Sequence, residues 1–215
     1  MVLKSNGLLL VMVACLLALP AVAGDDEEAR KLGVTPPAEW AFPPAQPLQV
    51  WSVRGLWYDQ YGLDRALARV GGCVERSSWV QGNWIRWYSP DSYDELMRYH
   101  LAIIANTNGH AFANGRNPAP ARTRLKDYAA NGGAVLFLGG FFAFGREYHG
   151  TALEEMAPVT FAAHRDLERH PAGVPLAAGP DAPAGFAKLN WAAAPRVYWT
   201  HAVTLKPGAK VLLTA

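Results

Sequence analysis

The sequence predicts a three-layer α/β domain built on a mostly parallel, doubly wound sheet. Short apolar runs typical of strands alternate with segments of helical spacing, and glycine pairs end two of those segments. The runs LAIIA (101–105) and AVLFL (134–138) are apolar throughout, as in strands that are covered on both faces. Right-handed crossovers between such strands place helices on both sides of the sheet.

The first half of the domain contains a strand, a helix and a second strand. Residues 48–53 (LQVWSV) form a short apolar strand. Leu63, Ala66, Leu67 and Val70 recur at helical spacing, and Gly71-Gly72 ends that helix. We expect the second strand at residues 73–80.

The middle of the chain repeats this alternation. Ser92-Tyr-Asp-Glu95 is a capping box that begins a short helix reaching about Tyr99, before the strand at 101–105. We expect a helix over residues 120–131, which Gly132-Gly133 ends, followed by the strand at 134–138.

The last third of the chain is less regular. Thr151-Ala-Leu-Glu154 is a second capping box. We expect strands at residues 159–163, 197–199 and 203–205. We interpret residues 164–195, which are rich in Pro, Ala and Gly, as an excursion. Because the sequence ends at KVLLTA within an apolar run, we expect the C-terminal edge of the sheet to be truncated.

Residues 1–23 form a predicted signal peptide. Lys4 supplies a positive charge, residues 8–19 are apolar but short for a membrane span, and Ala21-Val22-Ala23 matches the small-x-small cleavage pattern. Cleavage after Ala23 predicts a secreted or periplasmic protein with no other membrane span. Two alternatives stay open: an uncleaved membrane anchor, and a lipoprotein, because Met12-Val13-Ala14-Cys15 is a loose lipobox.

Residues 24–47 separate the leader from the domain at residues 48–215. They begin with an acidic cluster, continue into the proline-rich TPPAEWAFPPAQP and show no periodicity, so we interpret them as a linker or a surface arm. Removal of the leader leaves Cys73 as the single cysteine, which excludes an internal disulfide and favours a buried structural thiol. A net charge of +2 with scattered basic residues argues against nucleic-acid binding.

Several stretches of the domain carry a family resemblance: YSPDSYDELMRYHLAIIAN, RLKDYAANGGAVLFLGG, FGREYHGTALEEMAPV and PGAKVLLTA. They resemble segments of glutamine amidotransferase-like domains, a group related in fold to the ThuA-like proteins. The third stretch looks like that group's G-T-x-L-E-E-x-x-P-V segment. The resemblance covers residues 48–215 and implies a flavodoxin-like fold of the class I glutamine amidotransferase-like type.

The family's catalytic groups are not found in the matching positions. Family enzymes attack the glutamine amide with a thiolate on a tight strand-to-helix turn, and a His-x-Glu pair completes the triad. The matching turn is Leu138-Gly139-Gly140-Phe141, in which neither glycine has a nucleophile. None of the six histidines is followed by glutamate two positions later. We therefore expect no glutaminase activity and no acid–base partners.

Ligands in open parallel sheets bind beside the loops that leave the carboxyl ends of the strands. The candidate ligand-binding residues come from the loops after the first, third and fourth strands: Arg54, Tyr58, Asn106, His110, Gly139, Gly140, Phe141, Tyr148 and His149. Aromatic faces, guanidinium groups and amides suit a polar ligand that is uncharged or anionic, such as a sugar or a carboxylate. Structural alternatives stay open, including an Asx turn at Asn106 and close strand–helix packing at the two glycines.

We expect no cofactor and no metal. The sequence has no Walker loop, no Gly-x-Gly-x-x-Gly and no Cys-x-x-Cys. His164, Asp166, Glu168 and His170 would share one face of a strand and resemble a metal cluster, but Pro171 and the neighbouring composition favour a solvated loop.

Three functions stay open on the sequence alone. The favoured one is an exported noncatalytic domain that binds a small polar ligand or a protein partner at the carboxyl edge of the sheet. The second is a ThuA-like enzyme of sugar metabolism that uses His110 or His149 as acid or base. The third is a structural module of an envelope assembly.

Overall fold

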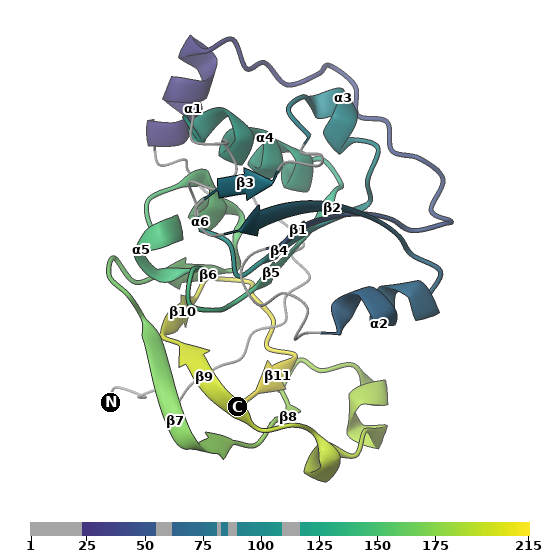
Figure 1. Ribbon diagram of the computed structural model, residues 1–215, viewed down its shortest axis with the longest axis vertical. Coiled ribbons are helices and arrows are strands. Elements are labelled where there is room, and N and C mark those ends of the chain that lie inside the picture. The colour runs from purple at the N-terminus through teal and green to yellow at the C-terminus, as the bar shows by residue number, and fades with distance from the viewer. Residues whose placement is uncertain (1–22, 55–61, 81–82, 86–89, 109–116) are drawn as a thin grey trace.

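A mostly parallel sheet forms the centre of the molecule (Figure 1). The structure is a computed structural model that describes residues 23–54, 62–80, 83–85, 90–108 and 117–215. The strand order is β3-β2-β1-β4-β5. The strands are β1 (Gln49–Arg54), β2 (Cys73–Val80), β3 (Asn83–Ile85), β4 (Leu101–Ala105) and β5 (Ala134–Leu138). All neighbours pair in parallel except β3, which forms a hairpin with β2. This arrangement confirms the predicted three-layer, flavodoxin-like α/β fold.

Helices cover both faces of the sheet because its apolar side chains alternate between the faces. Figure 1 shows α2 (Leu63–Arg69) on one side and α3 (Tyr93–Leu96) and α4 (Ala119–Ala130) on the other. Val50 and Ile103 pack with Leu67 of α2. Their neighbours Val53 and Ile104 face the opposite way, into the main core beneath α4.

Both predicted capping boxes are present. The Ser92 hydroxyl accepts the Glu95 N–H at 3.2 Å, and the Glu95 carboxylate accepts the Asp91 N–H at 2.8 Å. At α6 (Ala152–Met156), the Thr151 hydroxyl accepts the Leu153 N–H at 3.2 Å. These bonds satisfy backbone donors that a helix start leaves without partners inside the helix.

The region after α6 contains more strand than the sequence predicts. Expected strands are present as β6 (Val159–Phe161), β9 (Val197–His201) and β10 (Val203–Leu205). The expected excursion at 164–195 is wrong in part, because β7 (Leu167–Val174) lies within it and pairs with β9. The remaining short elements are α5 (Gly145–Tyr148), β8 (Ala177–Ala178), β11 (Leu213–Thr214) and two 3-10 turns at Ala184–Lys188 and Trp191–Ala193.

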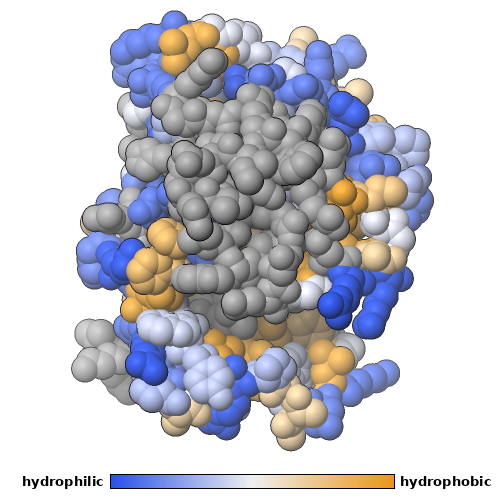
Figure 2. All heavy atoms as spheres, in the orientation of Figure 1, coloured by the Kyte–Doolittle hydropathy of each residue, from blue (hydrophilic) through white to orange (hydrophobic). Residues whose placement is uncertain are grey.

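The described surface is mixed in polarity. Figure 2 shows small, separate apolar areas among hydrophilic residues on the face it presents. Cys73 is exposed at the start of β2, so the expectation of a buried thiol is wrong. The reason is that Cys73 is the first residue of its strand, directly after the exposed turn that ends α2. In the part of the chain that the structure describes, no helix has the length and apolarity needed to cross a bilayer.

The N-terminal segment contains a helix that the sequence analysis does not predict. α1 (Ala23–Lys31) precedes an extended arm and packs along α4, as Figure 1 shows. Ala29 and Val34 are buried with Tyr93, and Trp40 packs against the same cluster. The segment at residues 24–47 lies on the domain surface, and its first part is helical.

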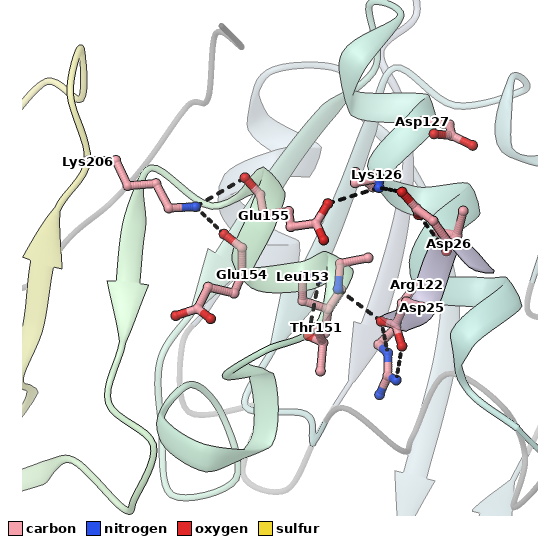
Figure 3. Close-up of polar contacts among 12 residues, drawn as sticks. Asp25, Asp26, Arg122, Lys126, Asp127, Thr151, Leu153, Glu154, Glu155 and Lys206 are labelled. Carbon is pink, nitrogen blue, oxygen red and sulfur yellow. Dashed lines mark hydrogen bonds and ion pairs between the residues drawn. The ribbon is translucent and has the colours of Figure 1, made fainter. Parts of the chain in front are cut away.

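Ion pairs hold α1 in place (Figure 3). Both oxygens of Asp25 accept hydrogen bonds from the Arg122 guanidinium, at 2.6 and 2.8 Å, and one also accepts the Ala152 N–H at 2.9 Å. Lys126, which lies one turn after Arg122 on α4, contacts Asp26. α1 is thus tied to α4 and to the first residue of α6 by charge as well as by packing.

Candidate functional site

The turn after β5 lies at the carboxyl edge of the sheet, where the sequence predicts a site. Asn106, directly after β4, adopts φ of 45°, a left-handed conformation that asparagine tolerates better than most residues. Its side-chain oxygen accepts the Phe142 N–H at 2.9 Å. A Cβ atom on Gly140 would lie 2.4 Å from that oxygen. The close approach of the two loops therefore requires glycine at position 140.

An antiparallel ribbon brings two further side chains to this turn. β6 pairs with β10, and β7 pairs with β9, so Phe161 lies opposite Val203 and Leu167 lies opposite His201. Residues 162–166 therefore bulge out opposite Ala202 alone. The Ala202 N–H donates to the Asp166 carbonyl at 3.0 Å, which fixes the end of the bulge beside His201.

His201 and Asp166 form a buried pair next to the β5 turn. His201 Nδ1 lies 3.0 Å from Asp166 Oδ1, and the Gly140 N–H donates to His201 Nε2 at 3.0 Å. Since the Gly140 amide can only donate, Nε2 is the acceptor and Nδ1 carries the proton toward Asp166. The exposed fractions are 9% for His201 and 5% for Asp166.

Phe144 packs against this pair in an unusual backbone conformation. Its φ is 59°, which is rare for a bulky residue and costs about 1–3 kcal/mol. Its ring stacks on Phe161 with centroids 4.9 Å apart and contacts the His201 ring edge-on at 4.8 Å. Aromatic packing thus holds a strained turn beside the histidine.

A small depression, here called the β5 depression, opens between the turn and the bulge. It encloses about 10 Å³, enough for one water molecule or hydroxyl group. The Arg165 guanidinium lies 3.8 Å above the Phe141 ring at its rim. Asp166 Oδ2 is buried and has no hydrogen-bond partner among the described residues. The full lining comprises Phe141, Ala143, Phe144, Gly145, Glu147, Arg165, Asp166, Leu167 and His201.

Some of the predicted site residues do come together here. Asn106, Gly139, Gly140 and Phe141 meet at the carboxyl edge of β4 and β5, and Phe141 lines the β5 depression. The Arg54 side chain, Tyr58 and His110 lie outside the described residues.

Two other predicted residues have structural positions. Tyr148 is fully buried, and its hydroxyl donates to the Thr107 carbonyl. Burial raises the Tyr148 pKa far above its usual range, so the side chain is a neutral core donor. His149 Nδ1 lies 3.1 Å from the Phe161 carbonyl and 3.4 Å from Glu154, and His149 does not line the β5 depression. Tyr148 was predicted to lie in a loop, but it belongs to helix α5, which directs its side chain into the core.

Three residues at the depression, His201, Asp166 and Arg165, are not among the site residues predicted from the sequence. The expectation that acid–base partners are absent concerned the family's His-x-Glu partners; the structure adds a hydrogen-bonded histidine and aspartate, His201 and Asp166, that come from different segments of the chain. The interpretation of Asp166 as part of a solvated loop is wrong, since the bulge buries it. Alternating His and acidic residues at 164–170 were the available signal, but the partner histidine lies on the opposite strand of the ribbon.

The chemistry of the turn is incomplete for nucleophilic catalysis. The segment Gly139–Phe144 reads GGFFAF and has no hydroxyl or thiol. Cys73 lies at the amino end of β2, opposite Gln49 of β1, whereas the turn follows the carboxyl end of β5. Among the described residues, no group of three or more His, Cys, Asp or Glu side chains is arranged to hold a metal ion.

Comparison with known proteins identifies a fold neighbour and no family. No protein-family model matches the chain, and no curated protein matches its sequence. A solved structure of a cytoplasmic protein from Salmonella typhimurium LT2 superposes with a TM-score of 0.62 at 17% sequence identity. The match covers 77% of this chain and 78% of that chain. At this identity the likeness shows a shared fold alone.

Proposed function

We propose that this chain is an exported, glutamine amidotransferase-like domain that binds a small polar ligand without catalysis. One observation carries the proposal: the basic nitrogen of the His201–Asp166 pair accepts a backbone hydrogen bond from Gly140. A general base needs that lone pair for the proton it removes. Because the Gly140 amide occupies this lone pair and the turn has no nucleophile, the His201–Asp166 pair has a structural role: it joins the β5 turn to the bulge.

The β5 depression indicates the class of ligand. The Arg165 guanidinium lies over the Phe141 ring, and its N–H groups can donate two parallel hydrogen bonds to a carboxylate. A hydroxyl group in the depression would donate to buried Asp166 Oδ2, which has no donor among the residues that the structure describes. The enclosed volume accepts one such group and no whole molecule, so the remainder of the ligand lies outside it, beside Arg165 at the rim. These features together favour a hydroxylated carboxylate of the sugar-acid class.

Ligand binding is tested with D-glucuronate, and with D-glucose and acetate as the two halves of its chemistry. At about pH 7 we expect glucuronate at a hundredfold excess over its dissociation constant to stabilise the fold by about 2.7 kcal/mol, seen as a raised Tm. Arg165→Ala should abolish this shift. Arg169→Ala is the matched control, because Arg169 is also exposed and lies near an aromatic ring, that of Trp199, outside the depression. Equal shifts in both variants, or none in the unmodified protein, would reject the proposal.

A second candidate is an enzyme in which His201 acts as the base. The specific observation in its favour is the Asp–His pair beside the turn that holds the nucleophile in related folds. If this is correct, the purified protein should release glutamate from glutamine, or reducing sugar from glycosides, and His201→Gln should abolish that turnover. Absence of product from either substrate class in the unmodified protein supports the binding function instead.

A further inference from the structure

The hydrogen bonds of His201 depend on its protonation state. In the neutral ring, Nδ1–H donates to Asp166 and Nε2 accepts from the Gly140 N–H, with both heavy-atom distances at 3.0 Å. Histidine side chains change charge between about pH 5 and pH 8, and the imidazolium form has a proton on each nitrogen. Protonated Nε2 would then point a donor at another donor, the Gly140 amide.

Two donors at this separation repel each other, and they must move apart before an acceptor fits between them. We propose that protonated His201 and the Gly140 amide form a binding site for a small oxyanion, so that anion binding at the β5 depression takes up one proton. The inference rests on the proposed function, since it names what controls ligand binding at the same depression. A carboxylate or sulfate oxygen inserted between Nε2 and the amide nitrogen would accept from both.

The charges around His201 favour this coupling. On the bulge, Asp166 Oδ1 accepts from Nδ1 and stabilises the imidazolium, and Arg165 adds a positive charge at the rim. On α5, Glu147 lines the same depression and opposes an anion. The described part of the β5 turn, Gly139–Phe144, contributes no ionisable side chain. Protonation of His201 therefore changes the depression from one cation against two carboxylates, Asp166 and Glu147, to two cations against the same two carboxylates.

The turn itself is built to separate from the histidine. Gly140 has no side chain, and Phe141 is 41% exposed, so little apolar contact is lost when this part of the turn moves. By contrast, the neighbouring Phe144 ring packs in the aromatic cluster with Phe161. We therefore expect local movement at Gly140 and Phe141 only.

The bond is tested first without any ligand, by NMR titration from about pH 8 to about pH 5. The Gly140 amide should shift and lose protection from hydrogen exchange with the same midpoint as the His201 ring nitrogens. His201→Gln keeps an acceptor for Gly140 and a donor for Asp166 but cannot titrate, so the amide should stay protected throughout. His149→Gln, the control, should leave the transition unchanged. A Gly140 amide that ignores His201 titration would overturn the inference.

Anion binding is then measured with sulfate, which keeps its charge over this range. Its apparent affinity should rise about tenfold for each unit of pH decrease above the His201 transition, and this slope should vanish in His201→Gln. Sulfate affinity that does not change with pH would also overturn the inference. The two proposals fail separately: glucuronate binding at about pH 7 without a Gly140 transition rejects only the proton coupling. Proton-coupled sulfate binding without glucuronate binding rejects only the sugar-acid ligand.

Discussion

Removing the charge of Asp25 should destabilise the whole domain, because this carboxylate joins three helices. Asp25 is 7% exposed and Arg122 is 8% exposed, and two hydrogen bonds join them. The Ala152 N–H donates to the same carboxylate. Asp25→Asn preserves the side-chain volume but removes the Asp25 charge from beside a buried guanidinium. Breaking a buried ion pair from one side costs about 3–5 kcal/mol.

Even the lower limit of that cost, about 3 kcal/mol, produces a measurable change in Tm. For a domain of this length, a loss of about 3 kcal/mol lowers Tm by about 6–12 °C. Thermal and urea unfolding followed by circular dichroism would measure both values. Glu27→Gln is the matched control, since it makes the same change on the same helix at an exposed pair with Lys31. We expect its Tm to match that of the unmodified protein.

A Tm for Asp25→Asn no lower than that of Glu27→Gln would refute the reasoning. It would mean that α1 contributes nothing to the folded domain and that the arm lies loosely on α4. Double substitution with Arg122→Met refines the test, because removing both charges restores part of the loss if the cost arises from the guanidinium left behind.

Three further outcomes follow from individual side chains. Burial raises the Tyr148 pKa, so the folded state holds this proton more tightly than the unfolded state, and stability should fall as pH rises above about 10. Tyr148→Phe should reduce that slope in urea unfolding. Gly140→Ala, whose Cβ would lie 2.4 Å from Asn106 Oδ1, should cost about 1–3 kcal/mol, whereas Gly185→Ala has nothing within 4 Å and should be neutral. Exposed Cys73 should react with a maleimide in the native protein, as peptide mass spectrometry would show.

The sheet was predictable because its signals are local. The runs 101–105 and 134–138 are apolar at every position, and they become adjacent parallel strands with Leu101 opposite Ala134. Capping residues mark the starts of α3 and α6 in the same way, through contacts over three residues. These patterns report the layers of the fold directly.

Helix α1 was not predictable in this way, because few of its residues are apolar. Its fixed position depends on Asp25 meeting Arg122, which lies 97 residues further along the chain. Acidic clusters before a proline-rich stretch are typical of flexible linkers. Only the tertiary structure shows that Arg122 and Lys126 form a basic face on α4 against which this segment packs.

One part of the candidate site could be predicted from the sequence, and the other part could not. The turn at Gly139–Phe141 follows from strand β5, and the sequence analysis locates it. His201 and Asp166 reach it through a ribbon interrupted by the bulge at 162–166, and no spacing rule pairs residues across such an irregularity. The chemistry of the turn therefore depends on residues that become neighbours only on folding.

Gly139 packs against His201, and this packing predicts that a single substitution cannot introduce a working nucleophile at position 139. A Cβ at Gly139 would lie 2.9 Å from His201 Cδ2 and 3.3 Å from the Phe144 ring. The His201 ring cannot move aside cheaply, because Asp166 holds one nitrogen and the Gly140 amide the other. Gly139→Cys and Gly139→Ala should therefore lower the free energy of unfolding by similar amounts, about 1–3 kcal/mol. Neither variant should release glutamate from glutamine. Glutamate release by a stable Gly139→Cys variant would contradict this prediction, because it would show that His201 can act as the base for a nucleophile at position 139.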